Sequence, residues 1–299
     1  MEYMTGTKIK EELVFIAIVN YNGTEDTIEC IRSISDVNSY PNTKIVLVDN
    51  GSTDNNLENS IEDLPINSMN LKSEQINYID PEARNRADLF LIKSDLNGGF
   101  SYGNNLALRF IKKISQDEGY VFYLNNDAVL KRETLKILVS SIEDSEVLAP
   151  LSLNYYNEQV DSKGFGYLNI LTSQTSHDNK YFFSLRYMVG SAVFMAIKDS
   201  PFWDERYFLY FDDIDYSKTL SNRNLSLRFE GDSVIFHKVS KTTRLNKNIE
   251  FIKIQSLLKF YKKNYPHILP LIIVLRIFYY TYKLRFQYLR KLMQSIVKW

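Results

Sequence analysis

The 299-residue chain has a single cysteine, Cys30. One cysteine excludes an internal disulfide and a metal cluster held by several cysteines, and it fits a reducing compartment. The first 23 residues mix charges and lack the basic start and uninterrupted apolar core of a signal peptide. We therefore expect the chain to be made and kept in the cytoplasm.

Two phosphate-binding motifs are also missing. After the first expected strand the chain reads NYNGTED, residues 20–26, and not G-x-G-x-x-G, so it lacks the phosphate turn of dinucleotide-binding folds. The P-loop pattern G-x-x-x-x-G-K-[ST] does not occur in the sequence. Neither of these two nucleotide-binding loops is therefore expected.

The composition suits a globular protein. Apolar residues make up 44% of the chain and aromatic residues 14%, enough for a substantial core. The length allows one large α/β domain, or one domain with an appendage.

The net charge of zero conceals an asymmetry along the chain. From Lys241 to the end there are 13 Lys or Arg residues and one acid, Glu250, whereas residues 1–240 contain 23 basic and 35 acidic residues. The body is therefore acidic and the tail strongly basic, which indicates an interaction surface on the tail.

The basic residues of the tail alternate with aromatic and aliphatic ones. The longest run without a charge, residues 264–275, is too short to span a bilayer, which takes about 20 residues. Basic amphipathic helices with aromatic residues lie in the membrane interface and are attracted to anionic lipid. We expect residues 246–299 to form such a region on a membrane surface. Packing on the acidic body and a contact between copies of a homo-oligomer are the alternatives, and the acidic body argues against nucleic acid.

Apolar runs alternate with helical patterns through the body. VFIAIV (14–19) and IVLV (45–48) are rich in β-branched residues, as parallel strands covered on both faces are. Between them, a helix is expected from Thr24 onward. This order predicts an α/β fold with a doubly wound, mostly parallel sheet flanked by helices. Further strands are expected at 89–94, 120–124, 188–197 and 225–237, helices after Ser101 and around 135–142, and a peripheral helix-and-loop insertion at 55–88.

Polar clusters recur where expected strands end. VDNGSTD (48–54) and LNNDAVL (124–130) each follow a strand, and NGGFSYGNN (97–105) joins a strand to a helix. Asn, Asp and Gly are ordinary turn residues, so one such cluster means little alone. Because ligands bind at the carboxyl ends of the strands in open α/β sheets, several clusters at this edge favour one binding site.

The clusters also carry a family resemblance. NYNGTEDTIECIRSI, VDNGSTD, NGGFSYGNN, LNNDAVL, MVGSAVFM and WDERYFLYFDDIDY occur in that order and are followed by His237. Together they resemble the inverting family 2 glycosyltransferases of the GT-A fold, especially the rhamnosyltransferase-like branch. The resemblance covers roughly residues 12–245 and implies a GT-A domain over residues 1–245.

The resemblance implies a divalent metal, Mg²⁺ or Mn²⁺, which would neutralise the growing charge on a diphosphate leaving group. LNND stands at the place of the family's D-x-D motif, so that Asp127 matches its metal ligand and Asn125 replaces its first Asp. An amide oxygen is a weaker ligand for a hard cation than a carboxylate. His237 matches the histidine that completes metal or diphosphate binding.

The remaining site residues follow from the same comparison. Asp49 and Asn50 match the positions that hold the base and ribose of the donor, and the glycines of NGG allow close backbone approach. Trp203 matches a segment near the acceptor, where its ring would stack on a sugar face; a core tryptophan is the alternative. The expected donor-binding residues are Asn20, Tyr21, Asn22, Asp49, Asn50, Asn97, Gly98, Gly99, Asn104 and Asn126. The expected acceptor-binding residues are Gly190, Trp203, Asp212 and Asp215.

Asp213, within FLYFDDIDYS (208–217), matches the general base that takes the proton from the acceptor hydroxyl. Asp212, Asp213 and Asp215 crowd three carboxylates into four positions beside aromatic residues. Repulsion and burial both raise the affinity of a carboxylate for a proton, as a base requires. By itself, the stretch is also typical of a helix start, where Asp is a favoured cap.

The resemblance thus implies an inverting glycosyltransferase that moves rhamnose from dTDP-rhamnose to a hydroxyl of a growing bacterial surface glycan. The enzyme would be peripheral on the inner face of the plasma membrane. A UDP-hexose or galactofuranose donor is the alternative. A sugar-1-phosphate nucleotidyltransferase would need a Gly- and Arg-rich loop after the first strand, which NYNGTED is not. A non-catalytic nucleotide-sugar-binding partner protein is disfavoured by Asp127, Asp213 and His237.

Overall fold

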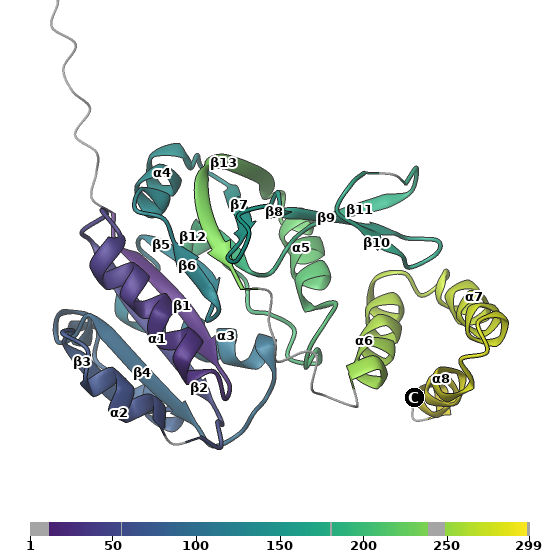
Figure 1. The fold of residues 1–299 in the computed structure, drawn as a ribbon, viewed down its shortest axis with the longest axis horizontal. Coiled ribbons are helices and arrows are strands. Elements are labelled where there is room, and N and C mark those ends of the chain that lie inside the picture. The colour runs from purple at the N-terminus through teal and green to yellow at the C-terminus, as the bar shows by residue number, and fades with distance from the viewer. Residues whose placement is uncertain (1–11, 55, 180, 239–248, 298–299) are drawn as a thin grey trace, which may run out of the picture.

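The computed structural model describes residues 12–54, 56–179, 181–238 and 249–297. A ten-stranded sheet runs through the larger part of these residues, and a small sheet and the C-terminal helices lie beside it (Figure 1). The strand order is β3-β4-β2-β1-β5-β12-β7-β13-β6, with β8 paired to β7. The strands are β1 (Val14–Asn20), β2 (Thr43–Asn50), β3 (Ser68–Lys72), β4 (Leu89–Ser94), β5 (Tyr120–Asn125), β6 (Ala128–Leu130), β7 (Glu146–Asn154), β8 (Val160–Ser162), β12 (Ala192–Ala196) and β13 (Ser226–His237).

The sheet is mostly parallel. From β3 through β4, β2 and β1 to β5, each pair of neighbours is parallel. Strand β12 is antiparallel to β5 and β7, and β7 is parallel to β13. The predicted α/β fold is therefore confirmed, with a mixed half that adds β12, β7 and β13.

Helices cover both faces of the sheet, so its central strands are buried. Along β1, Phe15 and Ala17 belong to the core under α3 and α5, whereas Ile16 and Ile18 belong to the core under α1, α2 and α4. This alternation follows from the two-residue period of a strand and explains the continuous apolar run. The helices are α1 (Thr24–Arg32), α2 (Asn56–Glu62), α3 (Phe100–Ser115), α4 (Thr134–Ser141), α5 (Asp212–Asn222), α6 (Ile249–Asn264), α7 (Leu269–Tyr282) and α8 (Phe286–Val297).

Three segments differ from the sequence-based expectation. The insertion at 55–88 contributes the edge strand β3 as well as a helix and turns. The expected strand at 188–197 is split, because the chain crosses from the small sheet into β12 through a turn at 189–191. The expected strands within 225–237 form one strand, β13, which has a bulge between Glu230 and Val234.

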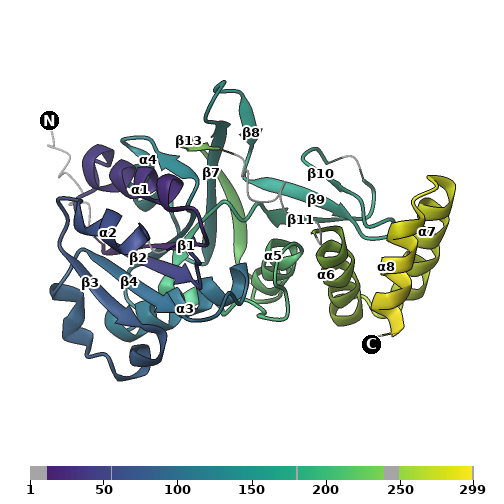
Figure 2. The same cartoon turned by 60° about the horizontal axis from the view of Figure 1, so that its bottom comes forward.

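A small antiparallel sheet in the order β10-β9-β11 lies between the main sheet and the C-terminal helices (Figure 2). The sequence did not predict it, because its strands are short. The strands are β9 (Phe165–Asn169), β10 (Thr175–Ser176) and β11 (Ser184–Met188).

The C-terminal helices extend one end of the molecule, with α6 beside α5 and the small sheet and with α7 and α8 outside it (Figure 2). Leu257, Leu258 and Phe260 of α6 are buried in one core cluster with Tyr207 and Ile214 of the body. Helix α6 therefore packs on the body. From the sequence, this packing was the alternative to a membrane-surface region. The predicted boundary at residues 245–246 lies outside the described residues. Among the described helices, none combines the length and apolar character needed to cross a bilayer.

Candidate active site

The carboxyl ends of β1, β2 and β5 meet at one edge of the sheet. Asn20 lies opposite Asp49 in the register of β1 and β2, and Val19 lies opposite Asn125 in the register of β1 and β5. The polar clusters that follow these strands are therefore neighbours, as expected from parallel pairing.

Asn20 and Asn126 join two of the loops at this edge. Asn20 is fully buried, and its Oδ1 accepts hydrogen bonds from Gly23 N at 3.1 Å and Thr27 Oγ1 at 2.9 Å. Asn126 Nδ2 donates to Thr27 Oγ1 at 3.0 Å. Asn20 consequently stabilises the loops from within the protein. The expected direct contact of Asn20 with a donor does not fit this burial.

Asn22 performs a similar function closer to the surface. Its Oδ1 accepts from the backbone N–H groups of Thr53 at 2.8 Å and Asp54 at 3.2 Å, which ties the loop after β1 to the loop after β2. Tyr21 beside it is 39% exposed and Asp49 is half-buried, so both side chains are accessible at this edge. Their donor-binding role stays a prediction.

Asn50 fixes the glycine loop that precedes α3. It is buried, and its Nδ2 donates to Asn97 Oδ1 at 3.2 Å and to Gly99 O at 3.0 Å. Asn104 is also buried and donates to Phe100 O at 3.0 Å. Asn50 and Asn104 therefore stabilise the loop, and direct contact of their amides with a donor does not fit this structure.

The glycines of this loop are required by packing. Gly99 has a φ of +88°, and a Cβ there would lie 2.2 Å from Phe208 O. A Cβ on Gly98 would meet the Tyr102 ring at 2.3 Å. The loop thus lies directly against the segment that leads to α5.

Asp127 and His237 face each other where β6 pairs with the end of β13. His237 Nε2 lies 3.2 Å from Asp127 Oδ1, in an alignment that does not make a hydrogen bond. Asp127 Oδ2 and His237 Nε2 are both buried and lack hydrogen-bond partners among the described residues. Within this described part of the chain, Asp127 Oδ2 thus has no polar partner and His237 Nε2 has only the charge of Asp127, and such incompletely satisfied buried atoms are costly unless something binds them.

These two side chains fit a divalent cation. Carboxylate oxygen and imidazole nitrogen are both metal ligands, and Mg²⁺ in nucleotide enzymes is held by one or two carboxylates together with substrate phosphates. The described residues contain no group of three or more His, Cys, Asp or Glu side chains arranged to hold a metal. Asp127 and His237 would therefore need diphosphate oxygens to complete the shell. The ligand role of Asn125, whose backbone N–H donates to Ser191 O at 3.0 Å, stays a prediction.

Asp161 of β8 is a member of this cluster that the sequence did not reveal. Its Oδ2 lies 3.1 Å from His237 Nδ1 and accepts from Ser152 Oγ at 3.1 Å. Burial lowers the pKa of His237, but Asp127 and Asp161 outweigh burial and raise it to about 9. A carboxylate on the far nitrogen fixes the ring orientation of a ligating histidine. No local pattern marks Asp161, because the contact joins residues 76 positions apart.

Asp213 lies in the first turn of α5. Helix α5 begins at Asp212, so Asp212, Asp213 and Asp215 all sit where the helix dipole favours negative charge. Burial, followed by the charge of Asp212, raises the pKa of Asp213, and chiefly burial raises that of Asp212. Asp213 is only half-buried, so a hydroxyl can reach it.

The turn before β12 connects Asp213 to the sheet edge where β5 ends. A Cβ on Gly190 would lie 3.4 Å from Asp213 Cβ, and the next residue, Ser191, accepts the hydrogen bond from Asn125 N. The end of β5 and the start of α5 are thus neighbours across two residues of one turn. Gly190 lies beside the candidate base, and its acceptor-binding role stays a prediction.

Trp203 does not have the environment that an acceptor-binding residue needs. It is 3% exposed, and its ring stacks on Tyr216 at 3.7 Å between centroids with an interplanar angle of 4°. Its backbone N–H donates to Asn105 Oδ1 at 2.8 Å. The expected stacking of Trp203 on a sugar is therefore wrong for this structure, and the residue belongs to the core.

Asp215 also has another function than expected. It is 2% exposed, and its carboxylate accepts from Lys263 Nζ at 2.6 Å and Asn264 Nδ2 at 2.9 Å. Both partners are on α6, so Asp215 fastens the C-terminal helices to the body. A direct contact with the acceptor does not fit this arrangement, whereas Asp212, at the start of α5, stays a predicted acceptor residue.

Residues 99–103, GFSYG, match the G-x-S-x-G pattern of serine hydrolases. Ser101 is fully buried, and its Oγ has no hydrogen-bond partner among the described residues. A nucleophilic serine must be accessible and bonded to a base. The glycines instead serve packing, since a Cβ on Gly103 would lie 2.6 Å from Val19.

Similar proteins support the same fold. The chain resembles GalNAc-T7 with UDP, GalNAc and Mn²⁺ (TM-score 0.59, 12% identity, 82% of this chain and 47% of that one). It also resembles the mannosyltransferase PcManGT from Pyrobaculum calidifontis in complex with GDP-Man and Mn²⁺ (TM-score 0.54, 15% identity, covering 96% of this chain and 74% of that one). A third similar structure is S. aureus TarS 1-349 in complex with UDP (TM-score 0.51, 17% identity, covering 84% of this chain and 72% of that one). At these identities the likeness concerns the fold, and the chain spans about half the length of GalNAc-T7.

No curated protein sequence matches the chain. The family described as glycosyl transferase family 2 matches residues 15–203, a range that ends before Asp213 and His237. Since this match covers more than half of the chain, and the fold agrees, the protein belongs to glycosyl transferase family 2 and has the GT-A fold.

Proposed function

We propose that the protein is an inverting, metal-dependent glycosyltransferase. It transfers a sugar from a nucleotide-sugar donor to a hydroxyl of a growing bacterial surface glycan. The observation that carries this proposal is the pair of buried atoms without hydrogen bonds in the described structure, Asp127 Oδ2 and His237 Nε2, at the sheet edge that the Gly190–Ser191 turn connects to Asp213. Asp127 and His237 suit a diphosphate with its cation, and Asp213 suits the removal of a proton.

In the proposed reaction, Asp213 accepts the proton of the acceptor hydroxyl while the hydroxyl oxygen attacks the anomeric carbon. The bond from that carbon to the diphosphate oxygen breaks on the opposite side, so the anomeric configuration inverts. The raised pKa of Asp213 makes its ionised form a stronger base than an ordinary carboxylate. Asp127 and His237 would hold a divalent cation, which supplies charge neutralisation for the departing diphosphate.

The donor is proposed to be dTDP-rhamnose, on the strength of the motif resemblance. A UDP-hexose, or UDP-galactofuranose, is the second candidate, and the UDP bound to GalNAc-T7 and to TarS favours it. A panel of nucleotide sugars, screened for Mn²⁺-dependent release of the nucleoside diphosphate, separates these candidates. Turnover of none of them by the wild type would favour a non-catalytic nucleotide-sugar-binding protein.

Two variants test the assigned roles. Asp127→Asn is expected to abolish the Mn²⁺ dependence of nucleotide binding and to leave the fold intact, because the side chain lies at the sheet edge. Asp213→Asn is expected to lower transfer by about 10²-fold or more and to spare donor binding. Unchanged Mn²⁺ dependence in the first variant, or equal losses of donor affinity and rate in the second, would contradict the assignment.

We also propose that the enzyme works on the inner face of the plasma membrane, with α7 as the contact. Leu271, Val274, Leu275, Phe278 and Tyr282 recur three or four positions apart on α7, and all are exposed, Phe278 at 69% and Tyr282 at 82%. An apolar stripe of this kind on a monomer surface marks an interaction site.

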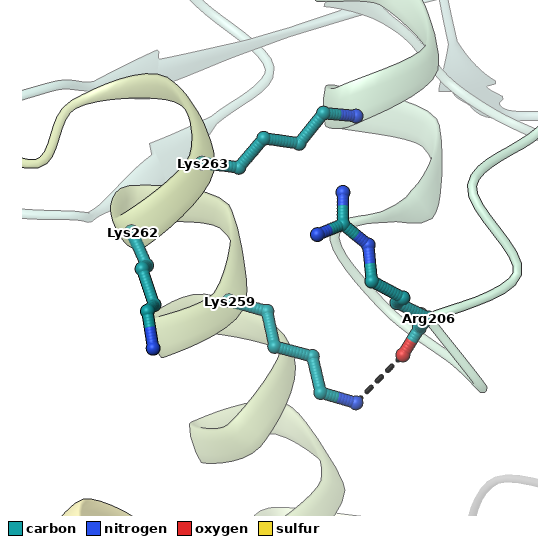
Figure 3. Close-up of a pocket in the computed structure, with 4 residues that line it drawn as sticks. All are labelled: Arg206, Lys259, Lys262 and Lys263. Atoms are coloured by element: carbon teal, nitrogen blue, oxygen red, sulfur yellow. Dashed lines mark hydrogen bonds between the residues drawn. The ribbon is translucent and has the colours of Figure 1, made fainter. Parts of the chain in front are cut away.

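The basic character of the C-terminal region favours anionic lipid as the partner of the stripe. Arg206, Lys259, Lys262 and Lys263 line a basic pocket of about 330 Å³ between α6 and the loop before α5. Figure 3 shows the Arg206 guanidinium extending toward Lys263, while Lys259 Nζ donates to the Arg206 backbone oxygen at 2.6 Å. Burial, with Arg206 next, lowers the pKa of Lys259, as expected where cations crowd together. Asp204 and Asp215 pair with Arg206 and Lys263 in this pocket, so the attraction to anionic lipid rests on the excess of 13 basic residues over one acid from Lys241 onward.

The membrane proposal is tested with vesicles. Phe278→Glu is expected to abolish sedimentation with vesicles that contain anionic phospholipid, and Phe182→Glu, which changes an exposed phenylalanine of the body, is the matched control. Binding should also weaken with salt. If neither the wild type nor the Phe278→Glu variant binds vesicles, and Phe278→Glu dissociates a dimer of the wild type, the stripe is a homo-oligomer contact.

A further inference from the structure

A cavity of about 350 Å³ opens beside Asp213 and is shared between the body and the C-terminal helices. This volume lies at the lower end of the range for small-ligand sites, about 300–1,000 Å³. The walls come from the small sheet (Ser173, Tyr187), the loop before α5 (Tyr210), α6 (Lys253) and α7 (Arg276, Tyr280). Ten of the 13 lining residues thus lie outside the family-matched range of 15–203, and six of these ten are on α6 and α7.

The loop beside the cavity is strained. Tyr210 and Phe211 are consecutive non-glycine residues with φ of +66° and +63°. The left-handed conformation costs roughly 1–2 kcal/mol per residue, so the surrounding structure must hold it, and such strain gathers at functional sites.

Helix α6 holds this loop in place. The Phe211 ring packs against Phe260 with 5.5 Å between centroids, and Ser256 Oγ donates to Leu209 O at 2.9 Å. Lys253 Nζ lies 4.6 Å from the centre of the Tyr210 ring. Helix α6 therefore fixes both the strained backbone at Tyr210 and Phe211 and the Tyr210 ring, which lines the cavity.

Helix α7 fixes the opposite wall. Arg276 donates from Nε to Ser173 Oγ at 3.0 Å and from Nη2 to Ser173 O at 3.1 Å. Ser173 is in the turn between β9 and β10, so this guanidinium spans from the tail to the small sheet. A guanidinium has five N–H donors, and those not used for Ser173 remain for another acceptor at the wall.

The chemistry of the walls suits an uncharged saccharide. Tyrosine rings offer flat apolar faces with polar edges, which match the faces and hydroxyls of a sugar. The cations Lys253 and Arg276 are balanced in formal charge by Asp213 and Glu250, which line the same cavity. A phosphate or an acidic sugar would bring a further acidic group beside the carboxyl groups of Asp213 and Glu250.

We propose that α6 and α7 complete the acceptor site, and that this cavity takes the short neutral saccharide end of the acceptor. Lys253 and Arg276 hydrogen-bond its hydroxyl groups and set acceptor specificity, and the reacting hydroxyl points to Asp213. The inference rests on the proposed glycosyltransferase function and adds to it the acceptor class and the residues that select it.

The experiment compares two reactions of the same protein. Hydrolysis of the donor found in the nucleotide-sugar screen needs no acceptor, whereas stimulation of nucleotide release by methyl hexosides, maltose, lactose or chitobiose needs one. Arg276→Gln and Lys253→Met are expected to raise the KM for the stimulating saccharide about tenfold or more, because each removes a hydrogen bond from a charged donor. Hydrolysis should stay unchanged. Arg290→Gln, an exposed basic residue of the same region, is the control.

A binding measurement keeps the inference independent of turnover. Saturation-transfer NMR with the same saccharides, without donor, should give signals with the wild type and Arg290→Gln, and weaker signals with Arg276→Gln and Lys253→Met. Unchanged KM and signals in both variants would overturn the inference, as would a wild type that binds none of these sugars. A wild type that binds saccharides but turns over no nucleotide sugar would contradict the proposed function and leave the saccharide site supported.

Discussion

The contact between α6 and the body predicts a measurable loss of stability when Lys263 is replaced by methionine. Lys263 Nζ lies 2.6 Å from Asp215 Oδ2 and 2.9 Å from Asp204 Oδ2. Asp215 is 2% exposed, so Lys263→Met leaves a buried carboxylate without its cation. The change keeps the length and apolar stem of the side chain and removes the charge.

The magnitude follows from what remains around Asp215. Removing one partner of a fully buried ion pair costs about 3–5 kcal/mol. The Lys263 side chain is 31% exposed, so water can reach the vacated position, and Asn264 Nδ2 and Tyr207 OH still donate to the carboxylate at 2.9 and 3.3 Å. We therefore expect a loss of about 2 kcal/mol in the free energy of unfolding, or about 4–6 °C in Tm.

The assay is urea unfolding combined with a thermal melt. Lys283→Met, which removes an exposed lysine of the same region, is the control and should stay within about 0.5 kcal/mol of the wild type. The double variant Asp215→Asn, Lys263→Met should lose less than the sum of the single variants, because the neutral amide needs no cation. A Lys263→Met protein as stable as the wild type would refute the docking of α6 through this pair. So would strict additivity.

Three further results are expected. Gly99→Ala should destabilise the protein by at least about 1 kcal/mol and impair donor binding, because its Cβ would collide with Phe208 O and its φ is +88°; a thermal melt of the variant checks this. Asp161→Asn should weaken Mn²⁺-dependent nucleotide binding by about 10–100-fold through His237, with titration calorimetry as the readout. Asp213→Asn should stabilise the protein by roughly 1 kcal/mol at neutral pH, because the raised pKa means that the folded state disfavours the ionised carboxylate. That gain in stability should vanish below about pH 4, where Asp213 is protonated in both states, and should grow as the pH rises from about 4 to the raised pKa. Equal Tm differences between variant and wild type at pH 4 and pH 8 would contradict the raised pKa.

The local pattern of the sequence was sufficient for the framework of the body. The runs at 14–19 and 45–48 are strands, and the helix expected from Thr24 begins there. These elements follow from periodicity and turn residues, which act over a few positions. The meeting of the polar clusters at one edge followed from parallel pairing alone.

The misplaced residues are those whose environment depends on contacts far along the chain. Trp203 was expected at the acceptor from the family resemblance, yet it stacks on Tyr216 in the core. Asp215 was expected at the acceptor, yet it pairs with Lys263, which is 48 positions away. Asp161 was missed altogether, because only the pairing of β8 with β7 brings it beside His237.

The sequence by itself determined the alternation of strands and helices through the parallel half of the sheet, the charge difference between body and tail, and the chemical types available at the strand ends. These are properties of composition and short-range spacing, and they do not depend on which surfaces meet. Only the tertiary structure decided that α6 buries its apolar face on the body, that Arg276 and Lys253 reach the cavity of Asp213, and that Asp127 faces His237. Those arrangements depend on which apolar faces exclude water against each other, a long-range competition that no local pattern encodes.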